Sequence, residues 1–110
     1  MSHPFLLTLT RWTVVQTHEL LATLPRAAGG DLKNQLQRAS VSVALNLAEA
    51  SGRRGRDRRR FLDFAMGSAR ETREGLALLA ALGILEAAQV AGLDRQWDRV
   101  CAVLYRSMRE

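Results

Sequence analysis

Six arginines stand within eight consecutive positions near the middle of this chain. One acidic residue, Asp57, interrupts the run, and its members, here called the arginine cluster, are Arg53, Arg54, Arg56, Arg58, Arg59 and Arg60. A guanidinium group is a planar fork of N–H donors that matches the oxygens of phosphate or carboxylate. Gly52 and Gly55 beside it let a ligand approach the backbone closely. The run therefore predicts a site for a polyanion.

The charge of the whole chain is concentrated in this cluster. The 110 residues include 16 Lys and Arg against 11 Asp and Glu, a formal net charge of +5. Residues 53–60 carry this entire excess, so the remainder of the chain is balanced. Such concentration favours a local binding role over general solubility. Three interpretations stay open: a nucleic-acid site, a site for an acidic protein partner, and a solvated basic loop with no specific ligand.

A second group of polar residues interrupts an apolar pattern. Ser68 and Thr72 break the apolar stripe of their segment, and buried hydroxyl groups need hydrogen-bond partners. Asn46, at the edge of the preceding segment's stripe, is the expected partner, and Gly67 would let the two segments approach closely. Such a network is more typical of fixing helix register than of holding a ligand. Its expected members are Asn46, Glu49, Ser68 and Glu71.

Residues that commonly support catalysis or metal binding are few. His3 and His18 are the two histidines, and neither stands in the Glu-x-x-His spacing of di-metal helical bundles. Cys101 has no histidine near it in sequence and falls in an apolar stripe, which is typical of a small core residue. The chain contains no glycine-rich nucleotide-binding loop. We therefore expect no enzymatic activity, no metal and no cofactor.

Helices must position these residues, because no segment shows the alternation of a β-strand. Apolar periodicity predicts helices over about 8–24, 31–50, 57–82 and 86–108, with Asp31 as the N-cap of the second. Proline and glycine mark the connections. Short connections make neighbouring helices antiparallel, so we expect an all-α, antiparallel up-down-up-down four-helix bundle forming a single domain over residues 1–110. The arginine cluster then lies at the junction of the second and third helices.

The second predicted helix has two opposed apolar stripes. The main stripe contains Leu32, Leu36, Ala39, Val43, Leu47 and Ala50, and the opposite stripe contains Val41, Leu45 and Ala48. A helix of a monomeric bundle needs one apolar face, so the second stripe predicts a homo-oligomer interface. The alternative is that this helix is central and covered on both sides by its own chain.

The other helices show one stripe each. The first is expected to bury Trp12, Val15, Leu20 and Leu21, and the fourth to bury Trp97. A single cysteine favours a reducing compartment, and the sequence shows neither a signal peptide nor a long apolar span. We therefore expect a cytoplasmic protein with no membrane partner.

Several spaced motifs resemble one protein family. Residues 35–49 read QLQRASVSVALNLAE, Gly52-Arg53 and Phe61-Leu62 follow, and residues 65–71 read AMGSARE. This order is similar to the four-helix-bundle proteins encoded by intervening sequences of bacterial 23S ribosomal RNA genes. Their pattern is approximately Q-x-R-A-x-x-S-I-x-x-N-I-A-E-G, a basic linker, and F-L-x-I-A-x-G-S-x-x-E. The resemblance extends from about Leu24 to Leu85.

The resemblance implies an antiparallel four-helix bundle that assembles as a homopentamer. A related branch comprises the accessory proteins of diversity-generating retroelements, whose basic surface binds nucleic acid and a partner reverse transcriptase. The present chain departs from the family pattern at three positions. Ala44 replaces a frequent proline, Ala50 replaces a glycine, and Arg58 replaces an aromatic residue, which makes the linker more basic.

Overall fold

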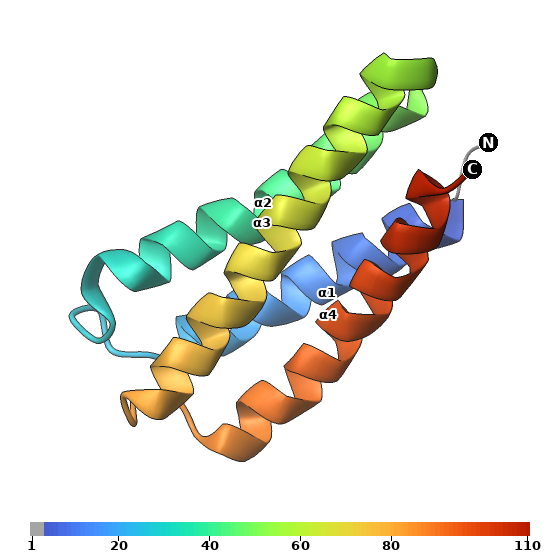
Figure 1. Cartoon of the computed structure of the whole chain (residues 1–110). Helices are drawn as coiled ribbons and strands as arrows, with labels where there is room; N and C mark the ends of the chain where they lie inside the picture. The colour runs from blue at the N-terminus through green and yellow to red at the C-terminus, as the bar shows by residue number, and fades with distance from the viewer. Residues whose placement is uncertain (1–3) are drawn as a thin grey trace.

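Four helices account for most of the chain in the computed structural model, which describes residues 4–110 (Figure 1). They are α1 (Pro4–Ala22), α2 (Gly30–Ser51), α3 (Gly55–Ala81) and α4 (Ala87–Met108). Within residues 4–110 there is no strand, so the expected all-α class is confirmed. None of these helices is long and apolar enough to cross a membrane.

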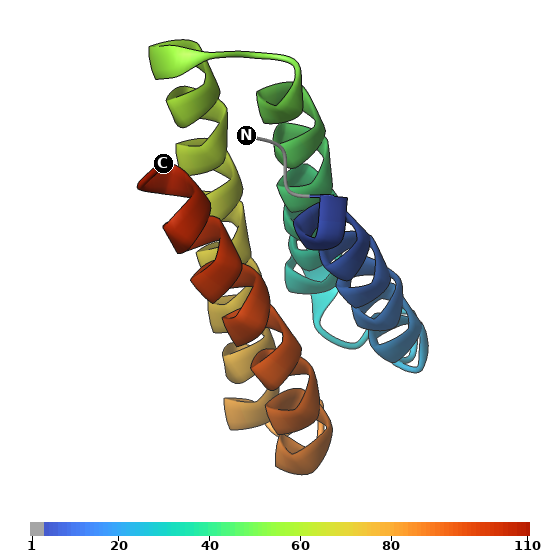
Figure 2. The same ribbon diagram turned by 90° about the vertical axis from the view of Figure 1, so that its right-hand side faces the viewer.

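The helices form a square in which each contacts two neighbours. The contacting pairs are α1 with α2, α2 with α3, α3 with α4, and α4 with α1. Within the described residues the diagonal pairs do not approach each other. Figures 1 and 2 show that successive helices run in opposite directions, as the short connections predict. The bundle measures 42 × 22 × 19 Å.

Two helix starts differ from the sequence prediction. Asp31 does not cap α2: Gly29 holds the cap position, with φ of 78° and no side-chain hydrogen bond, and Asp31 lies in the first turn. There its negative charge still interacts favourably with the positive end of the helix dipole. Helix α3 begins at Gly55, two residues before the expected Asp57, so that all of residues 56–60 are helical.

The buried face of α1 consists largely of threonines, which corrects the predicted apolar body of this helix. Leu21 is buried as expected, but Trp12 and Val15 are about half exposed, at 55% and 48%. Threonine methyl groups can pack inside, and the hydroxyls of Thr13 and Thr17 bond to carbonyls of their own helix. The fully buried threonines of α1 are Thr10, Thr13 and Thr17.

Helices α2 and α3 need a glycine at position 75 and not at the expected Gly67. A Cβ atom on Gly75 would overlap the side chain of Leu36, whereas one on Gly67 would meet nothing. Leu36 is 1% exposed and has no room to move aside. The absence of a side chain at position 75 therefore leaves room for Leu36 between α2 and α3.

Candidate functional site

The arginine cluster lies at the projecting end of the α2–α3 hairpin. Figures 1 and 2 show the connection between these helices extending beyond the start of α1 and the end of α4, which lie at the same end of the bundle. Residues 51–60 include no fully buried side chain. A ligand can therefore reach this end from several directions.

Two arginines of the cluster are held by acidic and aromatic neighbours. Arg53 donates to Asp57 at 2.6 Å and to Glu49 at 3.1 and 3.2 Å, while Arg60 donates to the other Asp57 oxygen at 3.0 Å. Both guanidinium groups also lie over the ring of Phe61, at 4.5 and 5.1 Å from its centre. The hydrogen bond from Arg53 lowers the pKa of Asp57, so this carboxylate stays charged.

The remaining four arginines differ in whether their side chains have a partner. Arg58 donates to the backbone oxygen of Ser107 at 3.4 Å, and Arg59 lies 4.0 Å from Asp63. In the described part of the chain, the side chains of Arg54 and Arg56 make no hydrogen bond, ion pair or ring contact. Both are exposed. These two side chains are the ones best placed to bind an incoming anion.

The acidic residues of this end do not cancel its charge. Residues 49–63 contain six arginines against three carboxylates, those of Glu49, Asp57 and Asp63. Each carboxylate already lies against an arginine of the cluster. An excess of three positive charges per chain thus remains at a solvent-exposed helix start, where the α3 dipole adds a modest attraction for anions.

Ser42 connects the polar residues of α2 and α3. The Ser68 hydroxyl donates to Ser42 Oγ at 3.1 Å, and Asn46 Nδ2 donates to the same oxygen at 3.0 Å and to the Ser42 carbonyl at 2.9 Å. Asn46 and Ser68 thus share a network, but through a residue that the sequence did not single out. Glu49 lies outside it, bound to Arg53, and Glu71 lines the adjoining groove without a hydrogen bond in the described residues.

The second stripe of α2 lies on the outside of the bundle. Leu45 is 62% exposed and Val41 36% exposed, and Ala48 is exposed as well. Among the described residues α2 contacts only α1 and α3, and this exposure shows that neither neighbour covers the stripe. An open, mainly apolar groove of about 500 Å³ runs over it, between His18 and Asn46.

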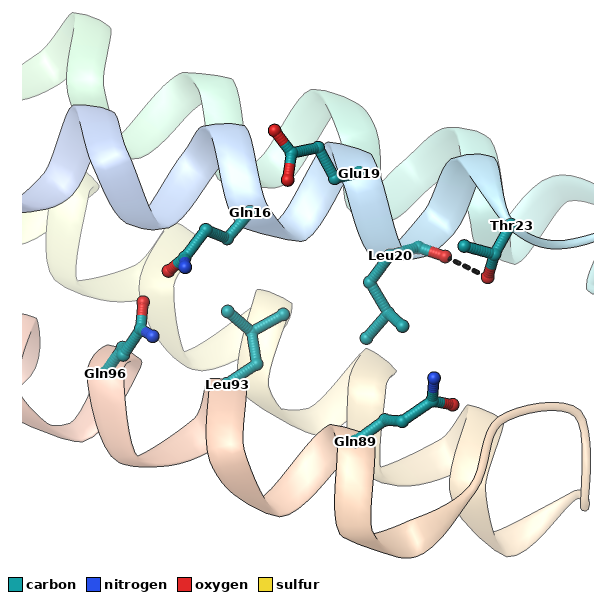
Figure 3. A pocket seen from close by; sticks show the side chains of 7 residues that line it. All are labelled: Gln16, Glu19, Leu20, Thr23, Gln89, Leu93 and Gln96. Carbon is teal, nitrogen blue, oxygen red and sulfur yellow. Dashed lines mark hydrogen bonds between the residues drawn. The ribbon is translucent and has the colours of Figure 1, made fainter.

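Another groove, of about 410 Å³, lies between α1 and α4 (Figure 3). The side chains of Gln16 and Gln96 face one another across it, and their Oε1 atoms are buried without a partner in the described residues. Glu19 is the sole titratable residue in its lining, so the groove offers no paired acid and base.

An ion-pair cluster joins α3 to α4. Arg73 donates to both oxygens of Asp94, at 2.8 and 3.0 Å, and to Asp98 at 3.2 Å. Cys101 lies beside it, and burial raises the pKa of this thiol. Such a thiol stays protonated at neutral pH and is a poor nucleophile.

The histidines and the remaining acidic residues form no metal site in the described structure. His18 Nε2 lies 3.2 Å from the Gln37 carbonyl, between α1 and α2, whereas His3 falls outside the described residues. Among residues 4–110, no group of His, Cys, Asp and Glu is arranged to hold a metal ion.

Comparison with known proteins agrees with the fold. A family model described as "23S rRNA-intervening sequence protein" matches residues 8–106. The chain is also similar to the crystal structure of a protein of unknown function from the S23 ribosomal protein family of Bacteroides thetaiotaomicron. The two share 18% identity and a TM-score of 0.84, over 96% of this chain and 99% of that one. A search of curated proteins finds no match to this sequence.

Proposed function

The chain belongs to the family of 23S rRNA-intervening sequence proteins, and we propose that its arginine cluster binds nucleic acid in the cytoplasm without catalysing a reaction. The observation that carries this proposal is the position of Arg54 and Arg56. Both are exposed at the projecting end of α2 and α3, and neither is paired within the described residues. Phosphate groups along a strand provide the repeated negative charges that such a cluster fits.

We further propose that the protein is a homo-oligomer assembled through Val41, Leu45 and Ala48. Their exposure supports this, because large apolar side chains gathered on one helix face are usually covered by a partner. The number of subunits, five, is what the family resemblance implies. Assembly would multiply the arginine cluster and let one strand contact several copies.

A salt titration tests the proposed binding. Fluorescent single-stranded and duplex RNA and DNA are titrated with the wild-type protein and with a variant in which six arginines become Gln: Arg53, Arg54, Arg56, Arg58, Arg59 and Arg60. If several subunits together contact about 6–10 phosphates, raising the salt concentration from about 50 to 200 mM should lower the wild-type affinity ~10³–10⁵-fold. We expect the six-fold variant to lose binding at all salt concentrations.

Two double variants separate a local site from net charge. Arg54→Gln with Arg56→Gln removes the two unpaired arginines of the cluster, and Arg26→Gln with Arg95→Gln removes two exposed arginines elsewhere. We expect the first to weaken binding at least about tenfold and to flatten the salt dependence. The second should stay close to the wild type. Equal loss in both variants would show that the whole surface, and not the cluster, attracts the strand.

If the wild type binds no RNA or DNA even at low salt, the proposal fails. The cluster would then serve an acidic protein partner, such as a reverse transcriptase, or no ligand. Circular dichroism of every variant provides the control for folding. The substituted residues lie outside the buried core, so the helical signal should not change.

A further inference from the structure

An exposed aromatic ring lies directly beside the arginine cluster. Phe64 is 51% exposed, and its ring packs edge-on against that of Phe61, with 5.8 Å between centres and 86° between planes. Phe64 follows Arg60 by four residues, so the two side chains share one face of α3. In the described residues, no arginine covers the Phe64 ring.

The neighbouring ring of Phe61 has a different role. It is partly buried, and the guanidinium groups of Arg53 and Arg60 lie over it. These contacts leave Phe61 as a support that holds both arginines and the Phe64 ring in place. Of this pair, Phe64 is the ring that can receive a planar ligand from solvent.

We propose that Phe64 stacks on an unpaired base, so that the arginine cluster takes single-stranded RNA or DNA in preference to duplex. This inference rests on the proposed function. Arginine contacts to phosphate can hold a single strand or a duplex. The bases of a duplex are already stacked inside it, so they cannot stack on Phe64. A basic surface with an exposed aromatic ring is the arrangement that single-strand-binding proteins use, and stacking is tolerant of sequence because every base has a flat face.

The spacing along α3 fits an extended strand. Arg56 and Phe64 are eight residues apart, about 12 Å along the helix axis at a rise of 1.5 Å per residue. A strand lying along α3 can therefore keep phosphates on the arginines at the projecting end while a base further along reaches the ring. The strand would follow the outer side of α3 away from the helix start.

The test is Phe64→Leu, which keeps an apolar side chain and removes the aromatic face. Affinities for a short single strand and for its duplex are measured by fluorescence anisotropy at one low salt concentration. We expect the variant to bind the single strand about 5- to 100-fold more weakly, as for the loss of one stacked base, with the duplex affinity unchanged within about twofold. Trp12→Leu is the matched control, since Trp12 is 55% exposed on α1, a helix that does not contact α3 in the described residues.

A fluorescent adenine analogue in the strand gives a second readout. Its emission should be quenched by the wild type and by Trp12→Leu, and much less by Phe64→Leu. If wild type and Phe64→Leu bind the single strand equally, the arginines act alone: the inference is overturned and the proposed function stands. If Phe64→Leu alters the molecular mass in solution and weakens both ligands together, Phe64 is a subunit contact and the inference is again overturned. Absence of any binding by the wild type would remove both proposals.

Discussion

Three threonines of α1 are fully buried, and their hydroxyl groups differ in the hydrogen bonds that they make. Thr13 and Thr17 donate to carbonyls one turn earlier, at 2.8 and 2.7 Å. Thr17 also accepts a 3.0 Å hydrogen bond from the indole N–H of Trp97, which is 0% exposed. The Thr10 hydroxyl has no partner in the described residues. Its burial therefore costs free energy that nothing nearby offsets.

Two conservative substitutions should have opposite effects on stability. Thr10→Val removes an unsatisfied hydroxyl while keeping the side-chain shape, so we expect the free energy of unfolding to rise by ~1 kcal/mol. Thr17→Val leaves the Trp97 indole N–H buried without an acceptor, and should lower the free energy of unfolding by ~1–3 kcal/mol. Urea denaturation followed by circular dichroism measures both. A shift of the same sign in the two variants would contradict this assignment of the hydroxyls.

At the scale of the helices, close packing of α2 against α3 depends on one glycine. Gly75→Ala adds a methyl group against the buried Leu36 side chain, and we expect a loss of ~1–3 kcal/mol in the free energy of unfolding. Gly67→Ala is the matched control on the same helix, because its methyl group meets open space. It should raise stability by ~0.5–1 kcal/mol through helix propensity. Equal effects would mean that the two helices are not in close contact at position 75.

The Arg73 ion pairs give the α3–α4 contact a dependence on pH. The hydrogen bonds from Arg73 lower the pKa of Asp94, so this carboxylate stabilises the fold above the ordinary carboxyl pKa and loses that effect as pH falls through the lowered value. Asp94→Asn should therefore reduce stability at pH 7, by less than ~1 kcal/mol because water screens this partly exposed pair, and its difference from the wild type should shrink as pH falls through the lowered pKa of Asp94. Urea unfolding at neutral and at acidic pH measures this. Asp98→Asn should have a smaller effect, since Asp98 is 70% exposed and accepts a single bond.

Helix positions were more predictable than helix contacts, for a physical reason. Apolar residues recur at the helical period, and each connection between helices contains proline or glycine, so local sequence contains both signals. The hydroxyl-lined face of α1 was missed because threonine counts as polar, although it can bond to its own backbone. Pairing of Arg73 with Asp94, 21 residues away, depends on how two helices are aligned along their axes, which periodicity does not specify.

For the arginine cluster too, local sequence identified the residues but not the contacts between their side chains. Residue types and spacing were enough to identify the basic run at the α2–α3 junction. The run alone did not distinguish Arg53, held by Glu49 and Asp57, from the unpaired Arg54 and Arg56. That difference depends on which side chains share a helix face once the turn has formed.

At the scale of the whole molecule, the square arrangement of the helices shows whether the second stripe of α2 is covered within its own chain. If this helix were central in its own chain, Leu45 would be covered, but it is 62% exposed. Among the described residues α2 contacts only α1 and α3, and neither helix covers Leu45. This supports the homo-oligomer that we propose.

Leu45→Glu is the substitution that tests the oligomer. Light scattering on a sizing column should give the wild type a mass that is a multiple of 12.2 kDa, five-fold if the family resemblance extends to assembly. The introduced carboxylate would place a charge in an apolar contact between subunits, so the variant should elute at the mass of one chain while keeping its helical signal. Leu82→Glu, at a position 65% exposed just after α3, should leave the mass unchanged. A wild type that is monomeric at micromolar concentration would contradict the proposed interface, and unfolding of Leu45→Glu would show that this face stabilises the single chain instead.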